Sequence, residues 1–80
     1  MKYKENAVYI TEAGVALKYS GHKWRIGSRI VYDMIVMRTV SPELTSHEPI
    51  VVGQVVRHHI DGECRRSWID GLRIVREVLP

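Results

Sequence analysis

The stretch KWRIGSRIVYDMIVMR, residues 23–38, decides the fold class of this chain. Its apolar side chains occupy the even positions from Trp24 to Val36, interrupted only at Ser28, while Arg, Gly and Asp occupy most odd positions as far as Asp33. This period of two predicts a strand with one apolar and one basic face. A strand of this length is expected to bend, and Gly27 is the expected position of a bulge.

The composition of the whole chain also favours β structure. The 80 residues include 11 Val and 8 Ile, against 4 Leu, 3 Ala and no Phe. Branched residues of this kind favour strands, whereas Leu and Ala favour helices. A chain of this length is expected to form one small domain, or a fragment of one, which excludes a multidomain enzyme, a TIM barrel and a two-halved dinucleotide-binding fold.

Turn signals divide the chain into short segments. They are 11–14, Ser20-Gly21, the polar stretch 41–49, Asp61-Gly62 and Asp70-Gly71. Asp-Gly is a strong hairpin signal because both residues tolerate the positive φ of tight turns. The expected strands lie between these signals, at 7–10, 15–19, 23–38, 50–59, 63–69 and 72–79. This spacing predicts a mainly β fold, a small SH3-like or OB-like barrel or meander of about five to six short strands.

The C-terminal third allows a second interpretation. Its apolar residues at 64, 68, 72, 75 and 79 also fit one face of a helix, although Gly71 and several β-branched residues oppose a helix there. Strand is favoured for 63–69, whereas strand and helix are nearly balanced for 72–79. The fold alternative is therefore α+β with a C-terminal helix.

The charges are segregated along the chain, which has a net charge of +3. The segments 18–38 and 57–76 are basic, whereas the segment 39–56 between them is acidic through Glu43 and Glu48. If the basic strands are neighbours, their cations form a stripe that follows a phosphate backbone. The predicted nucleic-acid-binding residues are Lys23, Arg25, Arg29, Arg57, Arg65 and Arg66. The alternative is that these are ordinary solvated strand faces, whose cations discourage edge-to-edge pairing.

Aromatic side chains are the usual companions of such cations, because unpaired bases stack on exposed rings. Trp24 and Tyr32 share the parity of the apolar face of their predicted strand, so both are expected in the core. Tyr19, beside Lys18 and a turn signal, is the expected exposed ring. Tyr19 therefore completes the predicted nucleic-acid site.

Other chemistry has little support in the sequence. Cys64 is the single cysteine, so no intramolecular disulfide forms; a buried thiol in a reducing, cytoplasmic environment is expected. His58 and His59 are adjacent and point to opposite faces of a strand, which argues against a shared metal. No catalytic motif, cofactor loop, signal peptide or membrane span is recognised.

These observations predict a small non-enzymatic module that binds nucleic acid, DNA or RNA, through an Arg-rich strand face with little base specificity. The alternative is a protein–protein interaction or assembly module. With 45 % apolar residues and little interior, such a domain completes its core by oligomerising or by docking on a partner, with 39–49 as a contact loop. An oligomeric enzyme with a composite site is the least favoured possibility.

Overall fold

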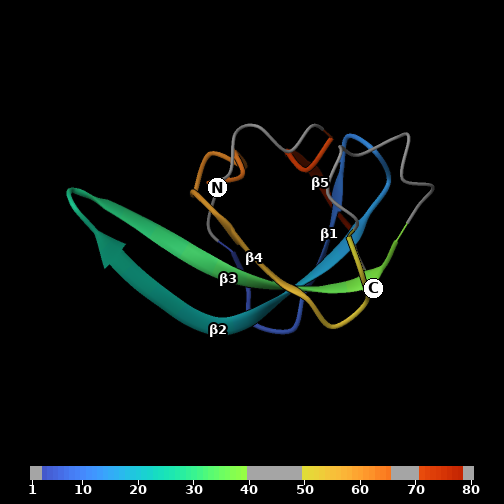
Figure 1. The fold of residues 1–80 in the computed structure, drawn as a ribbon, viewed down its shortest axis with the longest axis horizontal. Coiled ribbons are helices and arrows are strands. Elements are labelled where there is room, and N and C mark those ends of the chain that lie inside the picture. The colour runs from blue at the N-terminus through green and yellow to red at the C-terminus, as the bar shows by residue number, and fades with distance from the viewer. Residues whose placement is uncertain (1–2, 40–49, 66–70, 79–80) are drawn as a thin grey trace.

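The fold is a single antiparallel sheet, seen in a computed structural model that describes residues 3–39, 50–65 and 71–78. Its strands are β1 (Val8–Thr11), β2 (Ala16–Ile26), β3 (Arg29–Arg38), β4 (Val55–His58) and β5 (Ile74–Val78). They lie in the order β4-β3-β2-β1-β5 (Figure 1). The described residues contain no helix, which confirms a mainly β fold. The helical alternative for 72–79 is wrong over β5, because β5 pairs with β1.

The prediction of one long strand over 23–38 is wrong, because the chain reverses direction inside it. β2 ends at Ile26 and β3 begins at Arg29, and these two residues face each other across the sheet. Gly27 has a φ of +62°, as the first central residue of a type II′ turn requires. Gly27 and Ser28 therefore form a two-residue hairpin turn at the expected position of a bulge.

The converse error occurs at Ser20-Gly21, which was expected to be a turn and is a bulge inside β2. Tyr19 lies opposite Met34, yet the next paired residue of β2 is Lys23, opposite Tyr32. The Ser20 hydroxyl holds the bulge, donating to the Asp33 carbonyl over 2.9 Å and accepting from the His22 N–H over 3.2 Å. Beyond the bulge β2 continues past Val8, the first residue of β1.

The core lies on one face of the sheet and is rich in tyrosine. Leu17, Met34 and Tyr9 are fully buried there. The Tyr3 ring packs edge-on against Tyr9 at 5.1 Å between ring centroids and against Tyr32 at 5.0 Å. These rings supply the bulk that Phe provides in other small cores.

The remaining turns agree in part with the sequence predictions. The turn at Asp61-Gly62 is confirmed, since the Gly62 N–H donates to the His59 carbonyl over 3.0 Å. The predicted strand 50–59 is shorter, because 51–54 form a turn that leads into β4. Segment 63–69 is described only as far as residue 65, where Cys64 is buried as predicted and bridges to His58. The polar stretch 41–49 and Asp70, both predicted as turn signals, lie outside the described residues.

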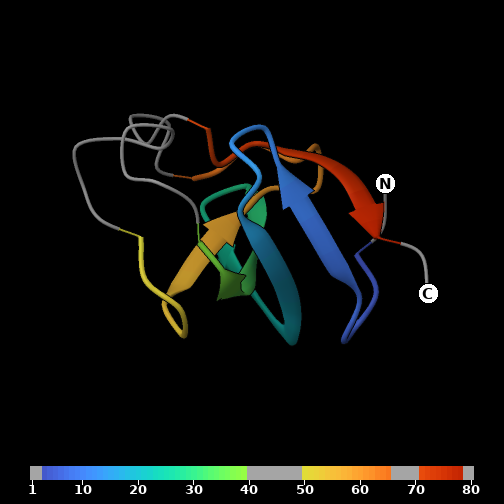
Figure 2. The ribbon, with the colours of Figure 1, turned by 90° about the vertical axis from the view of Figure 1, so that its right-hand side faces the viewer.

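Segment 62–65 makes backbone hydrogen bonds to β4 and to β5. The Ile74 N–H donates to the Gly62 carbonyl over 2.9 Å, and the Arg65 N–H donates to the Arg57 carbonyl over 2.8 Å. Segment 62–65 thus hydrogen-bonds to β4 on one side and to the start of β5 on the other. Figure 2 shows β4 and β5 on opposite sides of the sheet, as expected from their positions in the strand order.

Candidate nucleic-acid interface

The most exposed part of the described structure is the end of the β2–β3 hairpin, residues 21–30, which we call the arm. β1 pairs with β2 only as far as Lys18, and β4 pairs with β3 only from Tyr32 onward. Beyond these points β2 and β3 pair only with each other, and the arm projects from the rest of the sheet (Figure 1). Every residue of the arm is exposed, and none is acidic.

The pairing register assigns the side chains of the arm to two faces, because residues directly opposite each other share a face. Arg25 lies opposite Ile30, on the inner face, which continues the core side of the sheet. Arg29 lies opposite Ile26, on the outer face. Arg25 and Arg29 therefore point to opposite faces, although the sequence placed them on one stripe.

The other predicted cations extend this division. Lys23 lies opposite Tyr32 on the inner face. Arg57 lies opposite Asp33 on the outer face, and Arg65 is hydrogen-bonded beside Arg57. The structure thus places Lys23 and Arg25 on one face and brings Arg57 and Arg65 together on the other. Arg66 lies outside the described residues.

The predicted cations also differ in whether they form ion pairs. Arg29 contacts Asp61 at 3.5 Å, and Arg57 contacts Asp33 at 3.2 Å. The hydrogen bond from the Glu63 N–H lowers the pKa of Asp61, and the charge of Arg29 contributes in the same direction. Within residues 3–39, 50–65 and 71–78, the other three predicted cations make no ion pair: Lys23, Arg25 and Arg65.

The exposed ring of the site is Trp24, and the expectation for Tyr19 is wrong. Only 7 % of Tyr19 is exposed, whereas 51 % of Trp24 is exposed. Tyr19 precedes the bulge, lies opposite Met34 and packs against Tyr32, and its burial raises the pKa of its hydroxyl. Trp24 lies opposite Val31, on the outer face. The sequence prediction of a core Trp24 is therefore also wrong, because the turn at Gly27 reverses the strand.

Three side chains from three neighbouring strands hold the indole in place, and we call them the Trp24–Asp33–Arg57 cluster. The Trp24 Nε1–H donates to Asp33 Oδ2 over 2.7 Å, while Asp33 Oδ1 accepts from Arg57 Nε over 3.2 Å. The Arg57 guanidinium carbon lies 5.9 Å from the centroid of the Trp24 ring, within cation–π range. One carboxylate thereby fixes both an aromatic ring and a cation on the outer face.

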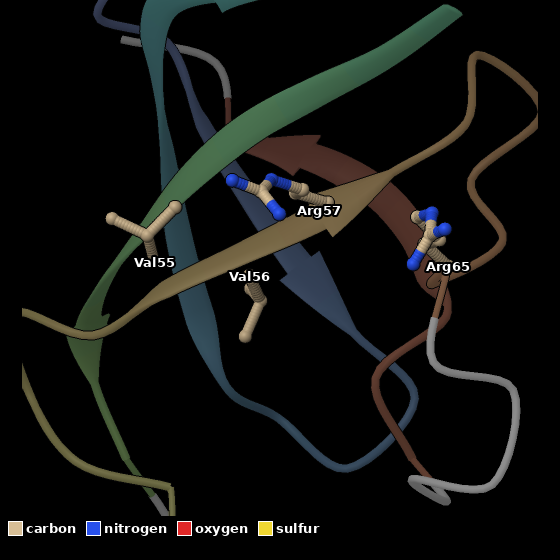
Figure 3. A pocket seen from close by; sticks show the side chains of 4 residues that line it. All are labelled: Val55, Val56, Arg57 and Arg65. Atoms are coloured by element: carbon tan, nitrogen blue, oxygen red, sulfur yellow. The ribbon is translucent and has the colours of Figure 1, made fainter. Parts of the chain in front are cut away.

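A hollow of about 280 Å³ adjoins this cluster at β4. The described residues that line it are Val55, Val56, Arg57 and Arg65. Figure 3 shows the two arginines on neighbouring segments, with the two valines along β4. Like charges that lie close together repel each other, so an anion seated beside Arg57 and Arg65 is stabilised by both.

The histidine pair contributes no positive charge through His58. His58 is fully buried, and its Nε2–H donates to the Leu72 carbonyl over 2.6 Å. Burial lowers the pKa of His58 to about 4, so the ring is neutral at pH 7. In the described part of the chain, no three His, Cys, Asp or Glu side chains are grouped closely enough to hold a metal ion.

Trp24 and Asp33 belong to the site but were not predicted as site residues from the sequence. The signal that identifies them is the dipeptide Gly27-Ser28, because Gly followed by a small polar residue between two β runs is a type II′ hairpin signal. A turn at this position places Trp24 on the same face as Asp33 and Arg57.

No family model, curated protein or solved structure matches the chain. The described residues also include no helix that is long and apolar enough to span a membrane.

Proposed function

We propose that this chain is a small non-enzymatic module that binds nucleic acid through its phosphate backbone, with little base specificity. The observation that carries the proposal is the arm, which is exposed along its whole length and has three cations and no acid. Arg65, which makes no ion pair among the described residues, adds positive charge on the same side beside the ion-paired Arg57. Such acid-free segments attract polyanions because binding releases condensed counterions.

The division of the cations between two faces is compatible with this role. The arm is a two-stranded ribbon paired with no other strand, so both of its faces meet solvent. Ribbons of this kind fit against nucleic acid, and the major groove of a duplex admits one. Lys23 and Arg25 on one face and Arg29 on the other can therefore contact phosphates together.

Salt dependence tests the proposal. Binding of a fluorescent oligonucleotide, followed by anisotropy between about 50 and 200 mM salt, is expected to weaken steeply. Replacing Lys23 and Arg25 by Gln removes two phosphate contacts and should reduce the slope of log K against log salt by about 1.4 to 1.8. The matched control replaces Lys4 and Arg73 by Gln, which removes the same charge from residues already paired with acids.

Two results would contradict the proposal. One is the absence of binding to both DNA and RNA at about 50 mM salt, where phosphate contacts are strong. The other is an equal loss of affinity in the arm variant and in the control, since net charge rather than the arm would then be responsible.

The second candidate function is protein assembly through the arm, and the exposed apolar side chains favour it. Ile26 and Ile30 are both more than one third exposed near the tip of the arm. A two-stranded ribbon is only marginally stable in water, so contact with a second copy or another protein would stabilise it. Sedimentation tests this alternative: association that is lost on replacing both isoleucines by Ser supports it, and a monomer at all concentrations refutes it.

Two finer assignments accompany the proposal. The strand order and the hydrogen bonds of segment 62–65 to β4 and β5 support a small barrel of the SH3-like type. The single buried thiol of Cys64 suits a reducing compartment, so we place the protein in the cytoplasm.

A further inference from the structure

We propose that Trp24 is a stacking platform for an unpaired base, so that the preferred nucleic acid is single-stranded. This inference rests on the proposed function, because it concerns the form of nucleic acid that the same surface binds. It is carried by the Trp24–Asp33–Arg57 cluster, in which a half-exposed indole is held by a hydrogen bond and by a neighbouring cation.

The indole ring of Trp24 is positioned before any ligand arrives. An exposed side chain normally samples several rotamers, and immobilising it on binding weakens affinity. Trp24 is already restrained by its 2.7 Å hydrogen bond to Asp33, which is itself held by Arg57. A base that stacks on this indole therefore meets little additional ordering cost.

Positively charged side chains lie close to the indole ring. Arg57 lies within cation–π distance of the indole and next to Arg65 at the hollow on β4. A nucleotide whose base stacks on Trp24 thus has guanidinium groups nearby for its phosphate. This combination of an aromatic ring with adjacent cations is how proteins bind single strands without sequence preference.

A duplex offers few bases to the Trp24 ring. Inside a duplex both faces of each base are covered by neighbouring bases, so only a terminal or flipped base can stack on a protein ring. Trp24 lies on the side of the arm rather than at its tip, where Gly27 and Ser28 form the turn. A single strand offers unpaired bases along its whole length, which makes it the favoured partner.

The wild-type chain provides the first test, with three labelled nucleic acids of equal length: oligo-dT, an abasic strand with the same phosphates, and a duplex. We expect oligo-dT to bind about 10-fold or more tightly than the abasic strand, the order of magnitude of one stacked base. The duplex should bind more weakly than oligo-dT at the same salt concentration.

Variants provide the second test. Trp24→Leu keeps apolar bulk but has no aromatic face, and we expect it to lose about 10-fold in affinity for oligo-dT. Its affinity for the abasic strand should be unchanged. Trp24→Phe keeps an aromatic face but loses the hydrogen bond to Asp33, so its affinity for oligo-dT should lie between those of the wild type and Trp24→Leu. The control Val75→Leu changes an exposed apolar residue of β5, outside the arm, and should leave binding unaltered.

The outcomes separate this inference from the proposed function. If oligo-dT and the abasic strand bind equally and with a steep salt dependence, the platform is wrong and phosphate binding stands. Preferential binding of the duplex overturns the platform in favour of insertion of the arm into a groove. If none of the three binds at low salt, the proposed function fails together with this inference. The comparison of strands needs no variant, so misfolding of Trp24→Leu does not affect it.

Discussion

The two halves of the β2–β3 hairpin belong to the same pair of strands, yet their surroundings are opposite. In the base of the hairpin, Leu17 lies opposite Val36 and Tyr19 opposite Met34, and all four are buried. In the arm, every residue from 21 to 30 is exposed. Backbone pairing is common to both halves, so pairing alone does not determine burial.

The neighbouring strands account for the difference in burial between the base and the arm. β1 and β4 pair with the base on either side, whereas neither pairs with the arm. Side chains of the base contribute to stability through burial at about 25 cal/mol per Å² of apolar surface, and those of the arm gain little from it. The residues of the arm are therefore available for binding rather than for holding the fold together.

The strongest test of this difference is a pair of truncations in β2. Leu17→Ala, in the base, should lower the free energy of unfolding by about 3 kcal/mol, because it leaves a cavity in the core. Ile26→Ala, in the arm, should lower it by less than about 1 kcal/mol. Urea denaturation followed by circular dichroism measures both changes.

Equal losses in the two variants would contradict the comparison, since the arm would then have to pack against something. If Leu17→Ala prevents folding altogether, the milder Val36→Ala, also in the base, gives a measurable substitute. The essential outcome is that the substitution in the base lowers the free energy of unfolding more than the substitution in the arm.

Stability should also depend on pH through His58, which lies on β4, the strand that pairs with β3 beside the base. His58 is buried with a pKa lowered to about 4, whereas an unfolded histidine has a pKa near 6.5. Between these values the unfolded chain binds the additional proton, so stability is full above pH 6.5 and falls as the pH decreases toward 4. The shift corresponds to a loss of about 3 kcal/mol. When His58 is protonated, the new N–H at Nδ1 has no hydrogen-bond acceptor among the described residues.

His58→Gln isolates this contribution. Gln can still donate to the Leu72 carbonyl but does not titrate, so its stability should change less between pH 7 and pH 4. Carboxylates titrate in both proteins, and their effect cancels in the comparison. Parallel pH profiles for the two proteins would show that His58 is not the titrating group.

Local sequence predicted the β class, the turn at Asp61-Gly62 and the burial of Cys64, because these depend on composition and short-range turn chemistry. It interchanged a bulge and a turn at Ser20-Gly21 and Gly27-Ser28, since both dipeptides combine a small polar residue with glycine. Contacts distant in sequence distinguish them. The Asn6 N–H donates to the Tyr19 carbonyl over 3.2 Å, which keeps β2 in the sheet up to the bulge.

The candidate site was predicted only in part for the same reason. The sequence identified its cations, but the faces on which they lie depend on where the strand reverses. Asp33 lies close to Arg25 and Arg29 in the chain, yet it contacts Arg57 on β4. That choice is made by the register between β3 and β4, which no local pattern encodes.

The smallest expected difference between the arm and the rest of the molecule concerns two glycines with positive φ. An alanine Cβ at Gly27 would meet no atom within 4 Å, so Gly27→Ala should cost only the backbone strain of a left-handed residue, about 1 kcal/mol. At Gly62 the same Cβ would lie 2.8 Å from the Ile74 carbonyl oxygen, which belongs to the backbone and cannot move freely. Gly62→Ala adds this displacement to the same strain and should cost about 2 kcal/mol or more. Thermal denaturation of the two variants measures the difference, and an equal loss would mean that segment 62–65 adjusts as easily as the arm.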